Sequence, residues 1–147
     1  MLRLLRFCAA LALASGCHNQ DEAGAEALWE SFHDEDYRSW ERAPGYPGRT
    51  PSSAAHGDAV EIFINDVLAD ALAGGKLGAW PEGSRIVKDG YEDGEPHLVA
   101  AMEKRADGWF WAEYDPDGEV NYSGAPKVCT NCHGSGADYV RAFGFPQ

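Results

Sequence analysis

The period of hydrophobic residues changes along the chain, and each change predicts a different element. Between residues 25 and 40, the side chains of Trp29, Phe32 and Trp40 fall on one face of a helix, which predicts an amphipathic helix there. Residues 43–53 contain three prolines and two glycines, so this stretch predicts a loop. The N-terminal part of the domain therefore begins with a helix that packs through its aromatic side.

Strict alternation follows and predicts a sheet. Val60, Ile62 and Ile64 alternate with more polar neighbours, and a short helix over residues 66–73 then ends at a Gly-Gly pair. Further strands are predicted over residues 84–88, 98–104 and 109–114, the last two as a hairpin, and a short C-terminal helix is predicted over residues 137–142. The pattern predicts an α+β fold, an antiparallel sheet with flanking helices.

The first residues read as an export signal. Arg3 and Arg6 precede an apolar run over residues 7–14 that is closed by small residues and is too short to span a bilayer. Residues 1–16 are therefore predicted to be a signal peptide. Two cleavage sites compete, because Ala12-Leu13-Ala14 fits ordinary cleavage and Ala14-Ser15-Gly16-Cys17 resembles a lipobox, although Leu13 lies one position too early.

The lipobox reading is favoured, because a polar and acidic stretch follows Cys17. It divides the chain into the signal peptide, a lipoprotein tether over residues 17–26 and a single domain over residues 27–147. The predicted location is the periplasm or the outer surface of a bacterium, with membrane attachment only through a lipid on Cys17. Either cleavage site would place the domain outside the cytoplasm.

Charge limits the choice of partners. The 147 residues carry a formal net charge of −12, and 12% of them are aromatic. Nucleic acid needs a basic surface, and anionic lipid headgroups would repel this chain. The aromatic content is sufficient for a folded core, so the domain is predicted to be globular and to bind neither nucleic acid nor a membrane surface directly.

The strongest chemical motif is Cys129-Thr130-Asn131-Cys132-His133. Of the four cysteines, Cys8 lies in the leader and Cys17 at the lipobox, so Cys129 and Cys132 are the pair in the domain. The Cys-x-x-Cys-His spacing lets two thiols reach the two vinyl groups of one haem, and the adjacent His133 can bind the iron. The motif predicts a covalently attached haem c near the C-terminus.

Other interpretations of the pair are weaker. A structural zinc site normally needs four ligands, and the domain has no second cysteine pair. A thiol–disulfide switch of the thioredoxin kind follows a βα pattern near the start of a domain. A plain disulfide in an interaction lipoprotein without haem is the third alternative.

The second axial ligand of the iron is not evident from the sequence. Met102 is placed in a predicted strand, and the remaining histidines are predicted to be tether or surface residues: His18, His33, His56 and His97. A five-coordinate iron with an open face is therefore expected, which suits small ligands. The alternative is a non-catalytic electron carrier whose iron is closed by Met102 or a histidine.

Several segments together resemble the cytochrome P-460 / cytochrome c′-beta family. Trp80-Pro81-Glu82-Gly83 and Trp109-Phe110-Trp111 accompany the haem motif, and this combination is far more specific than the haem motif alone. The matching segments are residues 60–66, 80–88, 107–112, 129–133 and 138–140. The resemblance implies a β-sheet fold with haem near the C-terminus, and either hydroxylamine oxidation or nitric oxide binding.

The resemblance also assigns roles to single residues. Lys88 matches the lysine that cross-links to haem in hydroxylamine-oxidising members, which makes it the candidate catalytic residue, although a surface lysine is the alternative. Val60 stands where those members have arginine, and Gly124 stands near a position that some fill with a carboxylate. Both departures count against full hydroxylamine-oxidising activity. Whether the protein is an enzyme, namely a hydroxylamine-oxidising oxidoreductase, therefore stays open.

Aromatic residues complete the predicted site. Phe63, together with Trp109, Phe110 and Trp111, is a candidate wall of the haem pocket or simply core. The predicted partners are a small nitrogen-containing ligand or substrate and a redox partner protein. The predicted oligomeric state is a homodimer.

Overall fold

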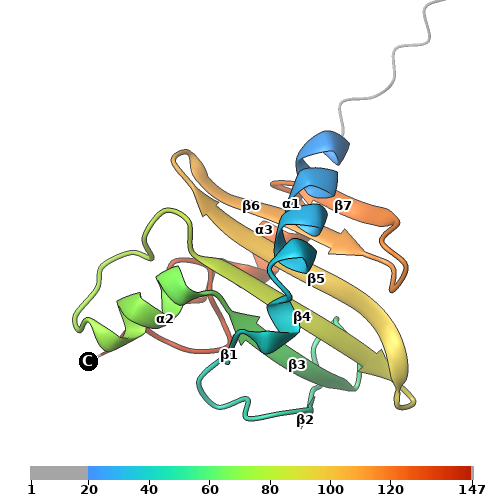
Figure 1. Cartoon of the computed structure of the whole chain (residues 1–147), viewed down its shortest axis with the longest axis horizontal. Helices are drawn as coiled ribbons and strands as arrows, with labels where there is room; N and C mark the ends of the chain where they lie inside the picture. The colour runs from blue at the N-terminus through green and yellow to red at the C-terminus, as the bar shows by residue number, and fades with distance from the viewer. Residues whose placement is uncertain (1–19, 147) are drawn as a thin grey trace, which may run out of the picture.

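The computed structural model describes residues 20–146, and a seven-stranded antiparallel sheet forms its centre (Figure 1). This sheet and its flanking helices confirm the predicted α+β fold. The strands are β1 (Glu41–Arg42), β2 (Thr50–Pro51), β3 (Ala59–Ile64), β4 (Arg85–Glu92), β5 (Glu95–Arg105), β6 (Gly108–Tyr114) and β7 (Val120–Gly124). The helices are α1 (Glu22–Asp34), α2 (Asp66–Ala73) and α3 (Lys127–His133), with a 3₁₀ turn η1 (Tyr37–Ser39) after α1.

The sheet is a meander in which β3 to β7 lie in chain order, each antiparallel to the next. Both short strands β1 and β2 pair with β3, at opposite ends of it. The register sets Lys88 of β4 between Ile62 of β3 and Ala100 of β5. Because alternate residues of a strand face opposite sides, these three side chains share one face of the sheet.

One face of the sheet is covered by α1, which crosses the strands in Figure 1. Asp21 caps the helix by accepting a hydrogen bond from the backbone N–H of Gly24. Its apolar side carries Leu28 and Phe32 onto the sheet, where they meet a cluster of aromatic and β-branched side chains from β3 to β6. We call this side the α1 face; its members include Phe63, Val87, Val99, Phe110 and Tyr114.

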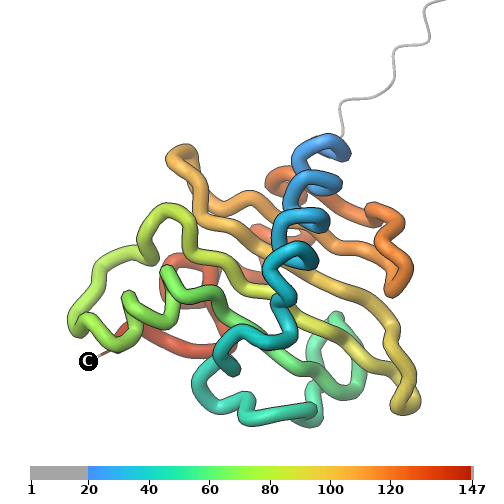
Figure 2. Tube along the Cα trace, viewed as in Figure 1, coloured from blue at the N-terminus to red at the C-terminus, as the bar shows by residue number. Residues whose placement is uncertain are grey.

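The opposite face is covered only in part. Leu68 of α2 and the C-terminal segment cover one end of it, and the tube in Figure 2 shows that segment (red) returning beside α2 (green). Trp80 packs between them, with its ring 5.6 Å from that of Phe143 and 4.8 Å from that of Phe145. We call this side the pocket face, because its remainder borders a cavity together with α3.

Two predicted helices need correction. The first ends at Asp34 rather than Trp40, because Asp36 takes the left-handed conformation (φ 48°) and redirects the chain into η1. The predicted helix over residues 137–142 is wrong. Residues 137 and 140 form an isolated bridge, and Asp138 and Tyr139 between them both have positive φ angles, which an α-helix does not allow.

The start of the folded part also differs from the predicted boundary at residue 27. Residues 22–26 already belong to α1, and Ala25 is fully buried and accepts a hydrogen bond from the Tyr114 hydroxyl. Strand β7 was not predicted. The predicted signal peptide and lipid site lie outside the described residues. Within residues 20–146, no helix has the length and apolarity needed to cross a bilayer.

Candidate functional site

The cysteine motif forms the short helix α3, which follows β7 directly. Because Cys129 and Cys132 are three residues apart on this helix, they lie on the same side of it. Both line a cavity of about 280 Å³ that lies between α3 and the pocket face of the sheet. Burial raises the pKa of the Cys129 thiol to about 11, so this group is protonated at neutral pH.

His133 ends the same helix and is oriented by the chain that follows it. Its Nδ1 lies 3.0 Å from the carbonyl oxygen of Tyr139, and the Trp111 ring contacts the imidazole with centroids 4.7 Å apart. A ring nitrogen bonded to a carbonyl must carry the proton, which leaves Nε2 as the atom with a free lone pair. Burial, and the charges of Lys88 and Arg141, lower the pKa of His133 and favour this neutral form.

The turn that supplies the Tyr139 carbonyl is held by several side chains. Asp138 accepts hydrogen bonds from the backbone N–H of Trp80 (3.1 Å) and from Lys104 Nζ (2.8 Å). The indole N–H of Trp109 donates to the Asp138 carbonyl at 2.8 Å. These bonds offset the cost of two consecutive left-handed residues, so the sheet itself fixes the partner of His133.

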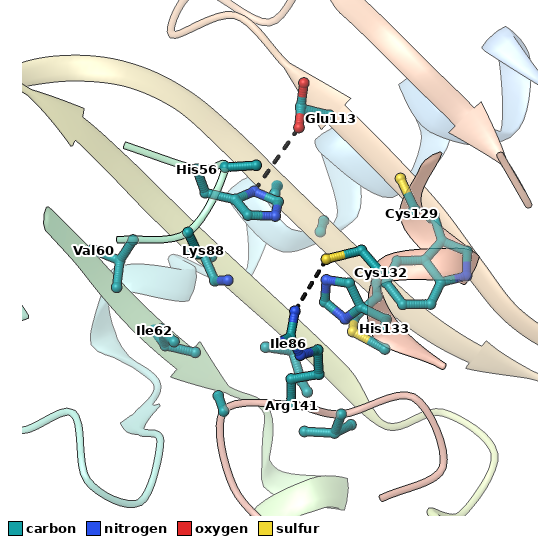
Figure 3. Close-up of a pocket in the computed structure, with 18 of the residues that line it drawn as sticks. His56, Val60, Ile62, Ile86, Lys88, Glu113, Cys129, Cys132, His133 and Arg141 are labelled. Atoms are coloured by element: carbon teal, nitrogen blue, oxygen red, sulfur yellow. Dashed lines mark hydrogen bonds and ion pairs between the residues drawn. The ribbon is translucent and has the colours of Figure 1, made fainter. Parts of the chain in front are cut away.

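Lys88 lies on the floor of the cavity (Figure 3). Its neighbours across the sheet on this face are Ile62 and Ala100, which are apolar. Burial, reinforced by the charge of Arg141 and opposed by Cys132, lowers the pKa of the Lys88 amine to about 8. The structure thus brings Lys88 together with Cys129, Cys132 and His133.

His56, in the loop before β3, was predicted to be a surface residue, and the structure corrects this. Its ring lies in the cavity, with its centroid 6.2 Å from that of His133. Burial lowers the pKa of His56 to about 3, with contributions from the charges of Lys88 and His133, so the ring is neutral at physiological pH. A loop has no periodicity that could have revealed the direction of this side chain.

Two charged residues complete the polar part of the cavity. Glu113 of β6 pairs across the sheet with Ala100, and burial raises the pKa of its carboxyl group. The site therefore holds a carboxylate although Gly124 carries none. Arg141 donates from Nη1 to the sulfur of Cys132 at 3.0 Å. Neither residue was among the predicted site residues.

The aromatic candidates divide between the two faces. Phe63 does not line the cavity; it packs on the α1 face, where its ring lies 5.5 Å from that of Tyr37. Phe110 is on the same face, whereas Trp111 lines the cavity together with Met102 and Val60. This division follows from strand alternation, because neighbouring residues of one strand face opposite sides.

This arrangement fits a haem. Two thiols on one side of α3 face the same cavity, the Nε2 lone pair of His133 is free to bind iron, and Val60, Ile62 and Ile86 offer apolar surface to a macrocycle. Within residues 20–146 both cysteines are free thiols, and no cluster of three or more His, Cys, Asp or Glu side chains is arranged to hold a metal ion.

Comparison with known proteins agrees with this fit. A family model described as Cytochrome P460 matches residues 34–141, which include the sheet, the whole cysteine motif and every residue lining the cavity except Ala142. No curated protein matches the chain.

Proposed function

Because the chain belongs to the cytochrome P460 family of haem proteins, we propose that Cys129, Cys132 and His133 hold one covalently attached haem c that binds small nitrogen compounds. The observation that supports this most is the fixed tautomer of His133, whose Nδ1 is bonded to Tyr139 beside two thiols that face the same cavity. Ligating histidines usually donate their other N–H in this way, because the bond sets the ring orientation.

Each residue of the site would have a separate role in holding haem or its ligand. Cys129 and Cys132 would form thioethers, and His133 Nε2 would bind the iron. When bound, haem supplies an iron that exchanges one electron and binds small ligands. Lys88 and Arg141 place positive charge beside the cavity and can donate hydrogen bonds to the oxygen atom of nitric oxide or hydroxylamine.

The protein is further proposed to act outside the cytoplasm, anchored by a lipid on Cys17. The support is the order of charge, apolar run and small residues at the start of the chain. An oxidising compartment suits covalent attachment of haem, and the acidic surface suits a basic redox partner.

A second candidate function, electron transfer without substrate chemistry, is favoured by one observation. His56 and Met102 both line the cavity, and both carry atoms that bind haem iron. In that case the iron would exchange electrons with a partner protein and bind external ligands weakly.

The proposal is tested with the full chain expressed in a host that attaches haem. We expect a pyridine haemochrome spectrum of the c type, which is lost when Cys129 and Cys132 are both replaced by alanine. Nitric oxide should shift the Soret band of the ferrous wild-type protein. Cys17→Ser is the matched control, because it should abolish lipid labelling and keep the haem. A wild-type protein without a c-type spectrum would refute the proposal.

A further inference from the structure

The imidazoles of His56 and His133 stand opposite each other in the cavity. Their centroids are 6.2 Å apart and their planes are inclined by 86°. His133 reaches the cavity from α3, and His56 reaches it from the loop before β3 (Figure 3). The two rings therefore approach the same space from different parts of the fold.

This separation matches a known metal geometry. Two imidazoles that bind one metal ion from opposite sides have ring centres about 6 Å apart, because each metal–nitrogen bond is about 2 Å and each ring centre lies about 1 Å behind its nitrogen. Perpendicular ring planes are compatible with such a pair. Without a metal this geometry is an edge-to-face ring contact. The same separation is close enough for the two rings to share one ion.

The remaining nitrogens agree with this interpretation. His133 uses Nδ1 for the Tyr139 carbonyl. In His56, Nδ1 is buried without a hydrogen-bond partner and lies 3.9 Å from Glu113 Oε2, which is the direction of the dashed line in Figure 3. This leaves Nε2 of each ring for a metal. A carboxylate behind Nδ1 is the usual second partner of a ligating histidine.

The backbone that carries His56 is seated firmly on the sheet. A Cβ at Gly90 of β4 would collide with the His56 carbonyl oxygen, and a Cβ at Gly57 (φ 109°) would collide with the Tyr91 carbonyl oxygen. Asp58 N–H also donates to the Tyr91 carbonyl at 2.9 Å. Because Gly57 and Gly90 have no side chains, the backbone at His56 can lie directly against the sheet, and this contact fixes the position from which the His56 side chain extends.

We propose that His56 is the second axial ligand of the haem iron, opposite His133, so that the resting iron is six-coordinate. The inference rests on the haem attachment proposed above and regulates the same site, because an external ligand must displace His56 before it can bind. Nitric oxide binds iron strongly enough to do so, whereas weaker ligands would be held back. Met102 and Lys88 line the same cavity, but His56 is the only histidine besides His133 among the residues lining it, and its ring lies 6.2 Å from that of His133.

The test compares ferric spectra and carbon monoxide binding of the purified holoprotein. We expect a low-spin wild type with a near-infrared magnetic circular dichroism band typical of two histidines. The ferric His56→Ala variant should be high-spin. The ferrous variant should bind carbon monoxide at least about tenfold more tightly than ferrous wild type, because no internal ligand competes. Added imidazole should restore the low-spin spectrum. His33→Gln, on the α1 side, is the matched control and should behave as wild type.

The outcomes separate the two proposals. A wild type with attached haem and a high-spin spectrum would overturn the role of His56 and leave the proposed function intact. A low-spin spectrum that survives in His56→Ala would assign the position to another residue. The wild-type infrared band decides the ligand pair even if the variant does not fold. A protein without haem would refute the proposed function first.

Discussion

Buried polar groups are treated differently on the two faces of the sheet. On the α1 face, Asp89 accepts hydrogen bonds from the Tyr37 hydroxyl (2.7 Å) and from Arg38 Nε (2.9 Å), so its charge is satisfied inside the fold. On the pocket face, Nδ1 of His56 has no hydrogen-bond partner, and burial depresses the pKa of Lys88. Unpaired buried polar groups cost stability, so an unpartnered His56 Nδ1 beside a lysine of depressed pKa indicates a surface shaped for a ligand.

The two faces should therefore respond differently to mutation. Changes on the α1 face should alter the free energy of unfolding and leave the haem spectrum as it is. Changes on the pocket face should alter the haem spectrum and should not destabilise the fold. Three variants test this contrast.

The largest effect is expected for Phe32→Ala on the α1 face. Phe32 is fully buried against Tyr37 and Tyr114, and its removal leaves a cavity that should cost about 3–5 kcal/mol of unfolding free energy. Urea unfolding measures this loss, and the Soret band of the folded variant should match that of wild type. A shifted Soret band would show that the two faces are coupled.

A smaller effect of opposite sign is expected for Lys88→Met on the pocket face. The pKa of Lys88 is lowered to about 8, so below that pH the folded state bears the cost of a buried charge. Removing the amine should stabilise the holoprotein by about 1 kcal/mol at pH 7, and the gain should shrink as the pH rises above about 8 and vanish above about 10.5, the ordinary pKa of lysine.

The same Lys88→Met protein reports on the cross-link that the family resemblance implies. A Soret band at longer wavelength in wild type than in the variant would show that Lys88 is bonded to the porphyrin. A loss of several kcal/mol on mutation would instead mean that Lys88 is a structural residue, which would contradict the contrast between the faces.

The smallest effect is expected for Glu61→Gln, again on the α1 face. Burial would raise the pKa of Glu61, but hydrogen bonds from Tyr91 and Arg42, with the charge of Arg42, keep it below its ordinary value. The carboxylate therefore stabilises the fold above about pH 4.5, and this contribution is lost as the pH falls through the folded pKa. Glu61→Gln should cost less than about 1 kcal/mol at pH 7, and this cost should shrink as the pH falls below about 4.5. A cost that does not change with pH would contradict this sign.

Much of the site follows from local patterns in the sequence. The cysteine motif identified three of its residues, and strand alternation places Lys88 on the same face of β4 as Ile86, which also lines the cavity. The same rule places Phe63 on the other face from Ile62, so its assignment to the pocket went against the pattern. The family and the fold class are confirmed, whereas export, the lipid and the partners stay predictions.

Other parts depend on contacts between distant residues. His56 is directed by the close approach of Gly57 and Gly90 to neighbouring backbone, and no local pattern encodes that contact. Residues 137–142 were predicted to form a short helix, and residues 137–140 form an isolated bridge. Hydrogen bonds from Trp80, Lys104 and Trp109 hold them in a bridge with left-handed residues instead. Tertiary interactions decide the structure in both cases.

The meander has a consequence for the order in which the molecule is built. From β4 to β7 each strand pairs with the next strand in the chain across a short loop, which favours rapid folding. Helix α3 and the turn that orients His133 come after the last of these strands. The strands that form the floor of the cavity can therefore fold before α3 docks on them. Haem that binds at that stage would meet a surface that is already folded.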